Sequence, residues 1–561
     1  MNNDHKFDTE IGNLLRRFDE AKMRRQRVEA VLDEIAYYVT PHRGNISSNT
    51  IPLFQKKTQV FDSTVMRAAD VLASTIHGGM TNPASKWVSF QFKDQELSFD
   101  DAAMRWIGNA AEVMMDSFNN PQSYFIGQNH QFIFDMVSLG TACMYVEESL
   151  EYKGDICFKT IPLCELYFLE DKKERVDTVF RQFRFTARQA AQMWGEKRLG
   201  ETLLKALEEN PDTDFDFLHA VLPSEDVKRL GLKRSGYDYT GFYISLDDRL
   251  VLNSHGYPRL PYIVSRFQKL TSELWGYSPS WTVLCDVKSV NKIAENILVN
   301  SNFQTNPPFL ISDDGVISKN RIKPGAHIPG GLTADSRRRI EILEMGGRLD
   351  VAASVQEKMQ KNIQDAFYMN QLLFRDGPQM TATEVVQISE EQLRLLGPQI
   401  GRFTSEYLGP LVDTVFDIQL KAGLYGPMPK SMTKRGKNIK VDVTFLGPLA
   451  KLQKLKEMQA LDRTLTAFGP LLQVKPDLLN NFELDVAIRD RSVFEGVPTR
   501  QIIPKEVVDA QRAEAQKQQE QMQQFQMMKE GGEAIGKIAD HLGKATDNGL
   551  FGTPPTQGGK E

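Results

Sequence analysis

The feature that most constrains this fold is a pair of long helices predicted over residues 348–420 and separated by a short turn. In residues 348–374, apolar side chains recur at helical spacing and no proline interrupts them, which predicts a helix of about 40 Å. Helices of this length are well above the average for globular proteins. The pattern therefore predicts either an elongated helical element or part of a large helical core.

The turn between the two helices is built from residue types that end a helix, because Gly and Pro interrupt the helical backbone. It comprises Arg375, Asp376, Gly377, Pro378, Gln379 and Met380. Thr381 followed by Glu384 has the spacing of a capping box, which predicts that the second helix starts there. Two Gly-Pro pairs, at residues 397–398 and 409–410, are expected to kink this second helix.

The chain before this pair mixes helical and strand-like patterns. Helices are predicted at residues 9–39, 62–79, 99–118 and 123–139, and Thr186 is expected to cap another that reaches Trp194. Strands are predicted at residues 87–92, 142–147, 156–162, 179–185 and 261–267, with a hairpin at 242–252. Residues 200–236 are highly charged and give no clear pattern. The predicted fold class is therefore α+β and predominantly helical.

A third long helix is predicted over residues 279–302, and strand-like segments at 309–311 and 340–343 lie between it and the helix of 348–374. After the kinked helix, a strand is expected at 439–445 and helices at 450–468, 481–490 and 504–513. Residues 511–561 begin as a Gln- and Met-rich helix, and from residue 546 Gly, Pro and Thr predict a disordered tail. Two long helices thus flank a small β-containing insertion.

Composition excludes several classes of protein. A chain of 561 residues suggests several domains, and a net charge of −5 argues against a basic protein that coats nucleic acid. No apolar segment is long enough to span a bilayer, and the N-terminus lacks the apolar core of a signal peptide. The four cysteines form no C-x-x-C pair and are expected to be small core residues in a reducing cytoplasm: Cys143, Cys157, Cys164 and Cys285.

The motifs of common enzymes are missing or incomplete. Residues 531–538 match a phosphate-binding loop, but Ile538 stands where a hydroxyl must bind Mg²⁺. Histidines are scattered, without the spacing of a zinc site, and no G-x-S-x-G motif of a hydrolase is present. We therefore expect no enzyme, no metal and no cofactor. Arg24, Arg25 and Arg27 form a basic cluster for which a solvated helix face is favoured over contact with DNA.

Over roughly residues 9–490 the chain resembles the portal proteins, or head-to-tail connectors, of podovirus-type tailed bacteriophages. The resemblance rests on five short motifs and on the order in which they follow one another. The motifs are residues 78–83 with Trp87, residues 139–148, Arg266 with residues 276–279, residues 380–385 and residues 447–450. The succession of helix, insertion, helix, turn and kinked helix completes the resemblance. The resemblance implies a ring, commonly of twelve subunits, at one vertex of the capsid.

The resemblance also implies a division of the chain into parts. Residues 1–278 would be the wing, 279–303 and 348–374 the stem helices, 304–347 the clip and 375–381 the tunnel loop. Residues 382–448 would be the kinked wing helix and strand, 449–510 the crown, and 511–561 the Gln- and Met-rich helix and tail. Residues 375–380 would then be DNA-facing candidates, and Lys358 and Lys361 candidates for lining the channel.

The same resemblance implies these partners: other copies of this chain, double-stranded DNA in the channel, the terminase packaging motor, tail adaptor proteins, and capsid and scaffolding proteins. It implies no binding to a membrane. The protein would reside in the virion and, during assembly, in the host cytoplasm. Arg337, Arg338 and Arg339 would contact motor, tail or DNA, or else pair locally with Glu341 and Glu344. Alternative identities are a packaging ATPase, which the defective phosphate loop opposes, and another structural virion protein such as a tail adaptor or internal ejection protein.

Overall fold

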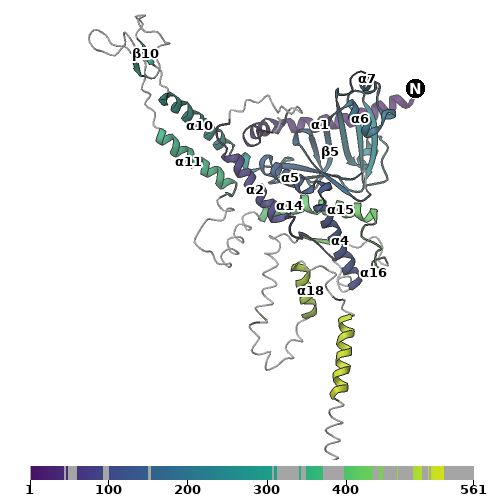
Figure 1. The fold of residues 1–561 in the computed structure, drawn as a ribbon. Coiled ribbons are helices and arrows are strands. Elements are labelled where there is room, and N and C mark those ends of the chain that lie inside the picture. Colours follow the sequence, from purple (N-terminus) through teal and green to yellow (C-terminus); the bar gives the residue numbers. More distant parts are fainter. Residues whose placement is uncertain are drawn as a thin grey trace, which may run out of the picture. The chain divides into compact units, whose positions relative to one another are not determined.

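The computed structural model describes residues 2–42, 46–47, 60–92, 100–149, 153–305, 309–311, 340–342, 349–369, 397–433, 441–445, 464, 466, 484–495, 503 and 507–523. The chain divides into two compact units. The first comprises Met1–Gln91, Asn109–Met428 and Val441–Thr466, and the second comprises Phe92–Gly108, Pro429–Lys440 and Ala467–Glu561. Helices and sheets are mixed, as the α+β prediction requires (Figure 1).

The largest sheet of the first unit has five antiparallel strands with helices on both faces. Its strands, in spatial order, are β4 (Leu166–Glu170), β5 (Val176–Thr186), β6 (Asp214–Pro223), β7 (Tyr239–Ser245) and β8 (Leu250–Tyr257). Helix α1 (Asn2–Val39) packs Leu14 and Phe18 against one face. Helices α6 (Ala187–Trp194) and α7 (Glu201–Glu209) cover the other face, where Trp194 contacts Phe217 with ring centroids 5.0 Å apart.

The charged region that gave no clear sequence pattern contains ordered structure. It holds α7, strand β6 and the short helix α8 (Ser224–Arg229). Strand β6 escapes prediction because both of its faces are buried, so that apolar residues follow one another instead of alternating with polar ones. Two single-turn helices, η2 (Leu163–Glu165) and η3 (Glu196–Arg198), also lie in this half of the chain.

A second, three-stranded antiparallel sheet has the order β3 (Ile156–Ile161), β2 (Thr141–Glu148) and β9 (Tyr262–Arg266). Helix α5 (Phe125–Leu139) packs on it, and α2 (Thr64–Met80) packs on α5. The chain between α2 and α5 forms strand β1 (Val88–Phe92), helix α4 (Asp101–Asn119) and the short 3-10 helix η1 (Pro121–Ser123). The buried Trp87 packs near Phe118 and Phe125, whose ring centroids lie 4.5 Å apart.

Among the predicted helix ends, the cap at Thr186 is confirmed, whereas both ends of α2 differ from the prediction. Thr186 caps α6 with a complete capping box, because its hydroxyl accepts from the Gln189 amide while the Gln189 side chain accepts from the Thr186 amide. The sequence predicts Asp62 as the cap of α2, but the N-cap is Ser63, which makes no side-chain cap bond. The Asp62 carboxylate lies one residue earlier and accepts from the Thr64 amide at 2.9 Å. Helix α2 does not stop at Gly78 and Gly79, however. It continues to Met80 because that side chain is buried in the core.

Arg25 corrects the interpretation of the basic cluster in α1. Its side chain is only 1% exposed, and its guanidinium donates to the carbonyl oxygens of Leu163, Cys164 and Leu166. The guanidinium also stacks on the Tyr167 ring at 4.4 Å. Arg24 and Arg27 are solvent-exposed, as predicted for a helix face. Arg25 therefore joins α1 to the edge of the five-stranded sheet and is unavailable to DNA.

The cysteine prediction holds only in part. Cys143 is buried and Cys164 is half-buried, whereas Cys157 and Cys285 are exposed. Cys157 lies on an outward-facing position of β3, where alternate residues point to opposite faces. No disulfide forms among the described residues.

The three long helical segments are present, with different ends. Ser278 precedes the short helix α9 (Pro279–Thr282), a break follows at Val283, and α10 (Leu284–Thr305) continues. Strands β10 (Phe309–Ile311) and β11 (Ile340–Ile342) pair antiparallel, which confirms both strand predictions, and α11 (Leu349–Ala366) lies beside α10 (Figure 1). Helix α11 ends before residue 374 because Tyr368 adopts a left-handed backbone conformation with φ of 57°.

The kinked helix is described from α14 (Gly397–Phe403) through a π-helical turn (Thr404–Leu408) to α15 (Gly409–Ala422). The predicted kink at residues 409–410 thus takes the form of a π turn. Strand β12 (Val441–Phe445) pairs with β1. The second unit contains the short helix α16 (Lys430–Thr433), helix α18 (Leu484–Glu495) and a helix at residues 507–523. Arg512 of the last helix forms a bidentate ion pair with Asp485 of α18.

Candidate functional site

Two glycines meet at the point where the chain enters the long helix α10. An ideal Cβ atom built on Gly140 would lie 2.3 Å from the carbonyl oxygen of Gly276, and one built on Gly276 would lie 2.1 Å from that of Gly140. Gly140 also ends α5 with a φ of 92°, a conformation that favours glycine. The two backbones approach so closely that neither position accepts a side chain.

Three hydrogen bonds hold the glycine junction, the contact between Gly140 and Gly276. The Gly276 amide donates to Thr141 Oγ1 at 2.8 Å, and the Ser278 hydroxyl donates to the Ser138 carbonyl at 2.7 Å. Trp281 Nε1 donates to the Leu139 carbonyl at 3.2 Å. The start of the α9–α10 segment is therefore held against the end of α5 and the start of β2. Two of the motifs that carry the portal resemblance meet here.

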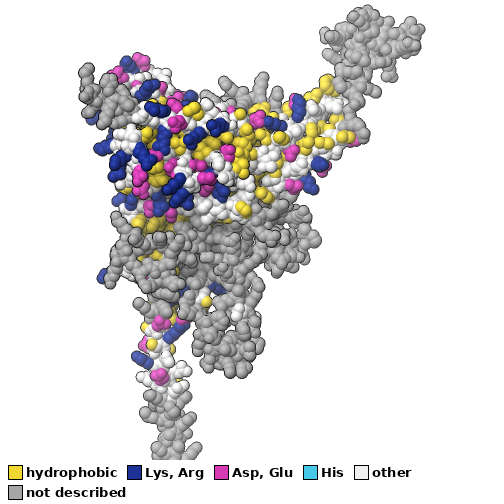
Figure 2. Space-filling model, turned by 180° about the vertical axis from the view of Figure 1, so that it is seen from behind, with side chains coloured by type: hydrophobic (Ala, Val, Ile, Leu, Met, Phe, Trp, Pro, Cys, Tyr) yellow, Lys and Arg dark blue, Asp and Glu magenta, His cyan; other side chains and the backbone are white. Residues whose placement is uncertain are grey.

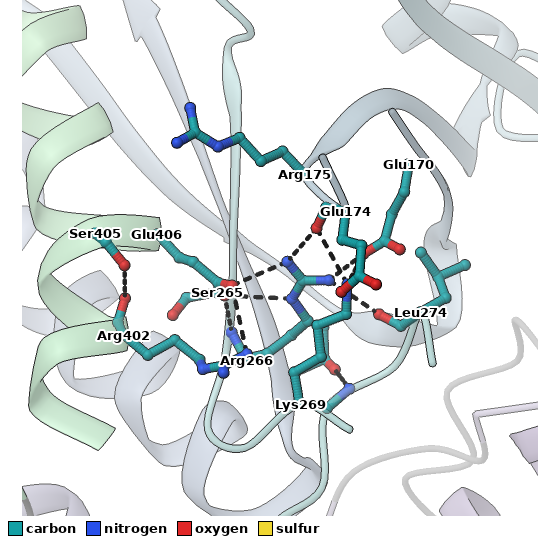
Figure 3. A network of polar contacts seen from close by, with 12 residues as sticks. Glu170, Glu174, Arg175, Ser265, Arg266, Lys269, Leu274, Arg402, Ser405 and Glu406 are labelled. Carbon is teal, nitrogen blue, oxygen red and sulfur yellow. Dashed lines mark hydrogen bonds and ion pairs between the residues drawn. The ribbon is translucent and has the colours of Figure 1, made fainter. Parts of the chain in front are cut away.

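Arg266, another residue of that resemblance, forms the centre of a buried ion network. Its side chain is 3% exposed. Glu406 Oε2 accepts from the Arg266 backbone amide at 2.9 Å, and Glu406 Oε1 accepts from the guanidinium at 2.9 Å. Glu170 and the carbonyl oxygens of Glu174 and Leu274 accept from the other guanidinium N–H groups (Figure 3). The network joins the end of β9, the edge of the five-stranded sheet and the π-helical turn.

A second polar network starts from the residue that follows Glu406. The buried Tyr407 hydroxyl donates to Asn129 Oδ1 at 2.7 Å, and Asn129 Nδ2 donates to Thr81 Oγ1 at 2.7 Å. Asn129 Nδ2 also lies 3.1 Å from His77 Nδ1. Burial, with a contribution from the nearby His130, lowers the pKa of His77. This network connects the π-helical turn to α5 and to the end of α2.

A buried histidine lies between the two sheets. His219 of β6 is 1% exposed, its ring stacks on Tyr243 at 3.9 Å, and its Nδ1 lies 2.6 Å from the Tyr262 hydroxyl. Burial, assisted by the nearby Arg181, lowers the pKa of His219 well below its usual range. His219 could not be found from the sequence, because an isolated histidine in a strand matches no motif.

Acidification is therefore expected to destabilise the protein through His219. Its pKa is lower in the folded chain than the 6.5 of an exposed histidine, so the unfolded chain binds more protons below pH 6.5. The stabilising contribution is present above pH 6.5 and falls by about 1.4 kcal/mol for each pH unit below it. Thermal unfolding at pH 7.5 and 5.5 measures the effect. His219→Gln should reduce the pH dependence, and an unchanged dependence in that variant would contradict the prediction.

Helices α10 and α11 leave apolar side chains exposed away from the glycine junction. The start of α10 is buried at Val287, Val290 and Ala294, and Ile363 near the end of α11 is 1% exposed. The antiparallel remainder of the pair is different, and yellow side chains lie at the surface of this arm in Figure 2. The exposed apolar residues are Leu298 (51%), Val299 (46%), Phe303 (39%), Val351 (47%) and Val355 (38%). Exposed apolar side chains gathered on one pair of helices are typical of a surface that another chain covers.

Polar contacts hold the buried ends of these helices to the segment before α2. The Phe61 amide donates to Asn291 Oδ1 of α10, and Gln360 Nε2 of α11 donates to Asp62 Oδ2, both at 2.6 Å. Lys288 of α10 pairs with Glu34 of α1. The pair of helices is therefore fixed at one end and unsupported by described residues along its outer half.

The predicted site residues fall into two groups. Lys358 and Lys361 lie on α11 and are exposed, and no ion pair within the described residues engages either of them. Residues 375–380 of the predicted tunnel loop, and Arg337, Arg338 and Arg339 of the predicted clip, lie outside the described residues. Sequence reasoning missed the roles of Asn129, Glu406 and Tyr407, which carry no local motif and become partners only in the folded chain.

The described part of the chain offers no conventional active centre. Within it, no group of three or more potential ligand side chains is arranged to hold a metal ion. No helix among the described residues is both long and apolar enough to cross a membrane. The arrangement instead joins two long helices and a kinked helix firmly to a body of two sheets, which suits a role in assembly.

Comparison with known proteins identifies this arrangement. Residues 12–503 match the model of the family described as bacteriophage head to tail connecting protein. A probable portal protein of Bordetella phage BPP-1 is 24% identical over 544 residues, which cover 94% of this chain and 95% of that protein. The portal protein of Salmonella phage epsilon15 is 24% identical over 522 residues, covering 90% and 91%.

A shorter similarity links the chain to the portal protein of Escherichia phage T7, at 25% identity over 241 residues. That match covers 42% of this chain and 43% of the T7 protein. The family match, in contrast, includes the glycine junction, the Arg266 network, the long helices and the kinked helix. The chain therefore belongs to the bacteriophage head-to-tail connecting proteins, the family that its sequence motifs resemble.

Proposed function

We propose that this protein is the portal subunit of a tailed bacteriophage, which forms a ring at one capsid vertex. Double-stranded DNA would pass through this ring during genome packaging and ejection. The observation that carries the proposal is the family match over residues 12–503, together with portal proteins similar over nearly the whole chain. These matches favour a connector over a tail adaptor or an internal ejection protein.

The exposed apolar side chains of α10 and α11 support assembly into a ring. A closed ring of identical subunits uses a heterologous interface, in which two different faces of one chain meet. The apolar outer half of the helical pair supplies one such face, and its neighbour in the ring would cover it. The family resemblance gives about twelve subunits as the expected number.

The charges on the same helices suit a channel that DNA traverses without being held. Each Lys or Arg that pairs with a phosphate adds salt-dependent affinity, so a conduit should carry few unopposed positive charges. Helix α10 has Asp286, Lys288, Lys292 and Glu295, and α11 has Asp350, Glu357, Lys358, Lys361 and Asp365. Acidic and basic residues nearly balance, and Lys292 pairs with Glu295 at 2.9 Å.

Within this proposal, the chain divides as the resemblance implies. Residues 1–278 and 382–448 form the wing, 279–303 and 348–374 the stem, and 304–347 the clip. Residues 375–381 form the tunnel loop and 449–510 the crown. The antiparallel pairing of β10 with β11 supports a compact insertion at the clip. The clip would meet the terminase motor and later the tail adaptors, and the crown would face the capsid interior.

Arg337, Arg338 and Arg339 remain candidates for contact with the motor, the tail or DNA, and pairing with Glu341 and Glu344 remains the alternative. Capsid and scaffolding proteins would surround the ring during assembly in the host cytoplasm, and the finished ring would reside in the virion. The protein would act without a cofactor and without enzymatic activity of its own.

Negative-stain microscopy and native mass spectrometry of the purified protein test the proposal. We expect closed rings of about a dozen subunits with a projecting stem and a central channel. Stable monomers or dimers at micromolar concentration, with no rings at any salt concentration tested, would exclude a portal ring. A closed ring without a central channel would instead exclude the role of DNA conduit.

A further inference from the structure

The π-helical turn Thr404–Leu408 lies where the burial of the kinked helix changes. In α14, Gly397, Pro398 and Gly401 are exposed, and a Cβ atom on either glycine would meet nothing within 4 Å. In α15, Leu411 and Val415 are completely buried. The start of α14 is therefore exposed, whereas the chain from Phe403, which is 2% exposed, through the turn into α15 packs in the core.

The sequence explains why the helix widens here. Pro410 has no N–H to donate to the Glu406 carbonyl, and its ring would collide with that carbonyl in a regular α-helix. The Gly409 amide bonds instead to the Thr404 carbonyl, five residues earlier. A Cβ atom on Gly409 would lie 3.2 Å from the same Thr404 oxygen, so glycine suits the position. The Gly-Pro pair thus sets the position of the π turn.

Two consecutive residues of this turn are held by different parts of the first unit. Glu406 uses both carboxylate oxygens on Arg266, and Arg266 also pairs with Glu170. Tyr407 is fully buried, donates to Asn129, and stacks on Phe132 with ring centroids 4.0 Å apart. One residue is thus tied to the two sheets, and the next is tied to α5.

We propose that Glu406 and Tyr407 are positioning residues that hold the π turn as a fixed pivot of the kinked helix. Helix α15 stays with the two sheets and α5. Within α14, Phe403 is buried with its ring 5.0 Å from that of Tyr407, and the exposed start of the helix, residues 397–401, would change direction about the turn. This inference rests on the proposed portal function, because the part of the kinked helix before the pivot follows the predicted tunnel loop in the chain. The pivot would set the direction of that helix as DNA passes.

Hydrogen–deuterium exchange in three variants tests the pivot. Tyr407→Phe keeps the ring and removes one hydrogen bond, and Glu406→Gln keeps the shape and removes the charge. Each should speed exchange of amides in residues 397–408 by about tenfold, the factor that corresponds to a net hydrogen bond, without changing residues 411–420. Ser405→Ala is the matched control, since its exposed hydroxyl bonds only the Arg402 carbonyl within the same helix. It should exchange like the unmodified protein.

Two exchange results would overturn the pivot: unchanged rates in residues 397–408, or an equal rise throughout α15, which would indicate general loosening. The functional arm measures the yield of DNA-filled heads when each variant replaces the natural protein. Tyr407→Phe and Glu406→Gln should form rings but fill fewer heads than Ser405→Ala. Filling at the natural level would refute the positioning role. Exchange is measured on the purified chain, so it tests the pivot even if the chain forms no ring.

Discussion

Arg266→Leu is expected to destabilise the first compact unit by about 1.5–3 kcal/mol, the range for a lost hydrogen bond to a charged group. The loss is limited because Lys269 still pairs with Glu170 and Arg402 lies 3.8 Å from Glu406. The substitution leaves Glu406 and Glu170 without the guanidinium that both carboxylates contact. It also frees the carbonyl oxygens of Glu174 and Leu274. Urea unfolding followed by tryptophan fluorescence measures the change, and the buried Trp275, adjacent to Leu274 in the chain, provides a nearby probe.

Arg259→Leu is the matched control for this measurement. Arg259 also pairs with two carboxylates of the kinked helix, Asp413 at 2.9 Å and Asp417 at 2.6 Å, but its side chain is 47% exposed. Solvent weakens such pairs, so the expected loss is less than about 1 kcal/mol. Equal losses from the two arginine substitutions would show that burial does not distinguish the Arg266 network, contrary to expectation.

The double substitution Val299→Asp and Val355→Asp is expected to abolish ring formation while leaving the fold of the subunit intact. Both side chains are exposed in the isolated chain, at 46% and 38%, so the aspartates remain solvated there. In a ring, a neighbouring subunit would bury them, and each unpaired carboxylate would then cost several kcal/mol at every interface. Native mass spectrometry measures the assembly, and circular dichroism with thermal unfolding monitors the fold.

Met193→Asp provides the control for assembly. Met193 lies on α6 and is 46% exposed, so the substitution adds a similar charge at a similarly exposed apolar position on another element. It should leave ring formation unchanged. Rings formed by the double variant at the natural yield would remove the outer half of α10 and α11 from the interface. Rings lost in both variants would indicate that added negative charge, wherever it lies, prevents assembly.

Much of the local structure could be predicted because short-range rules decide it. The capping box at Thr186 and the Asp62 contact at the start of α2 depend on residues within three positions of each other. The kink of the last long helix follows from the missing N–H of Pro410 and the small side chain of Gly409. The pairing of β7 with β8 around a tight turn is equally local.

Predictions failed where long-range packing overrides these local rules. Strand β6 loses its alternating pattern because helices cover both faces of its sheet. Arg25 has the sequence context of a solvated helix face, yet carbonyl oxygens from a segment well over a hundred residues away supply its partners. Gly78 and Gly79 predict a helix end, but α2 continues to Met80, whose side chain is buried.

The sequence alone determined the family. The spacing of apolar, Gly and Pro residues predicts the succession of long helices, insertion and kinked helix, and the order of the short motifs matches it. What only the tertiary structure decided is which of those motif residues touch. Gly140 and Gly276 meet, and Arg266 finds Glu170 and Glu406, although 96 and 140 residues of chain separate the members of those ion pairs. Such contacts depend on how sheets and helices pack, and helical or strand periodicity reports only which side of an element is buried, not which partner it meets.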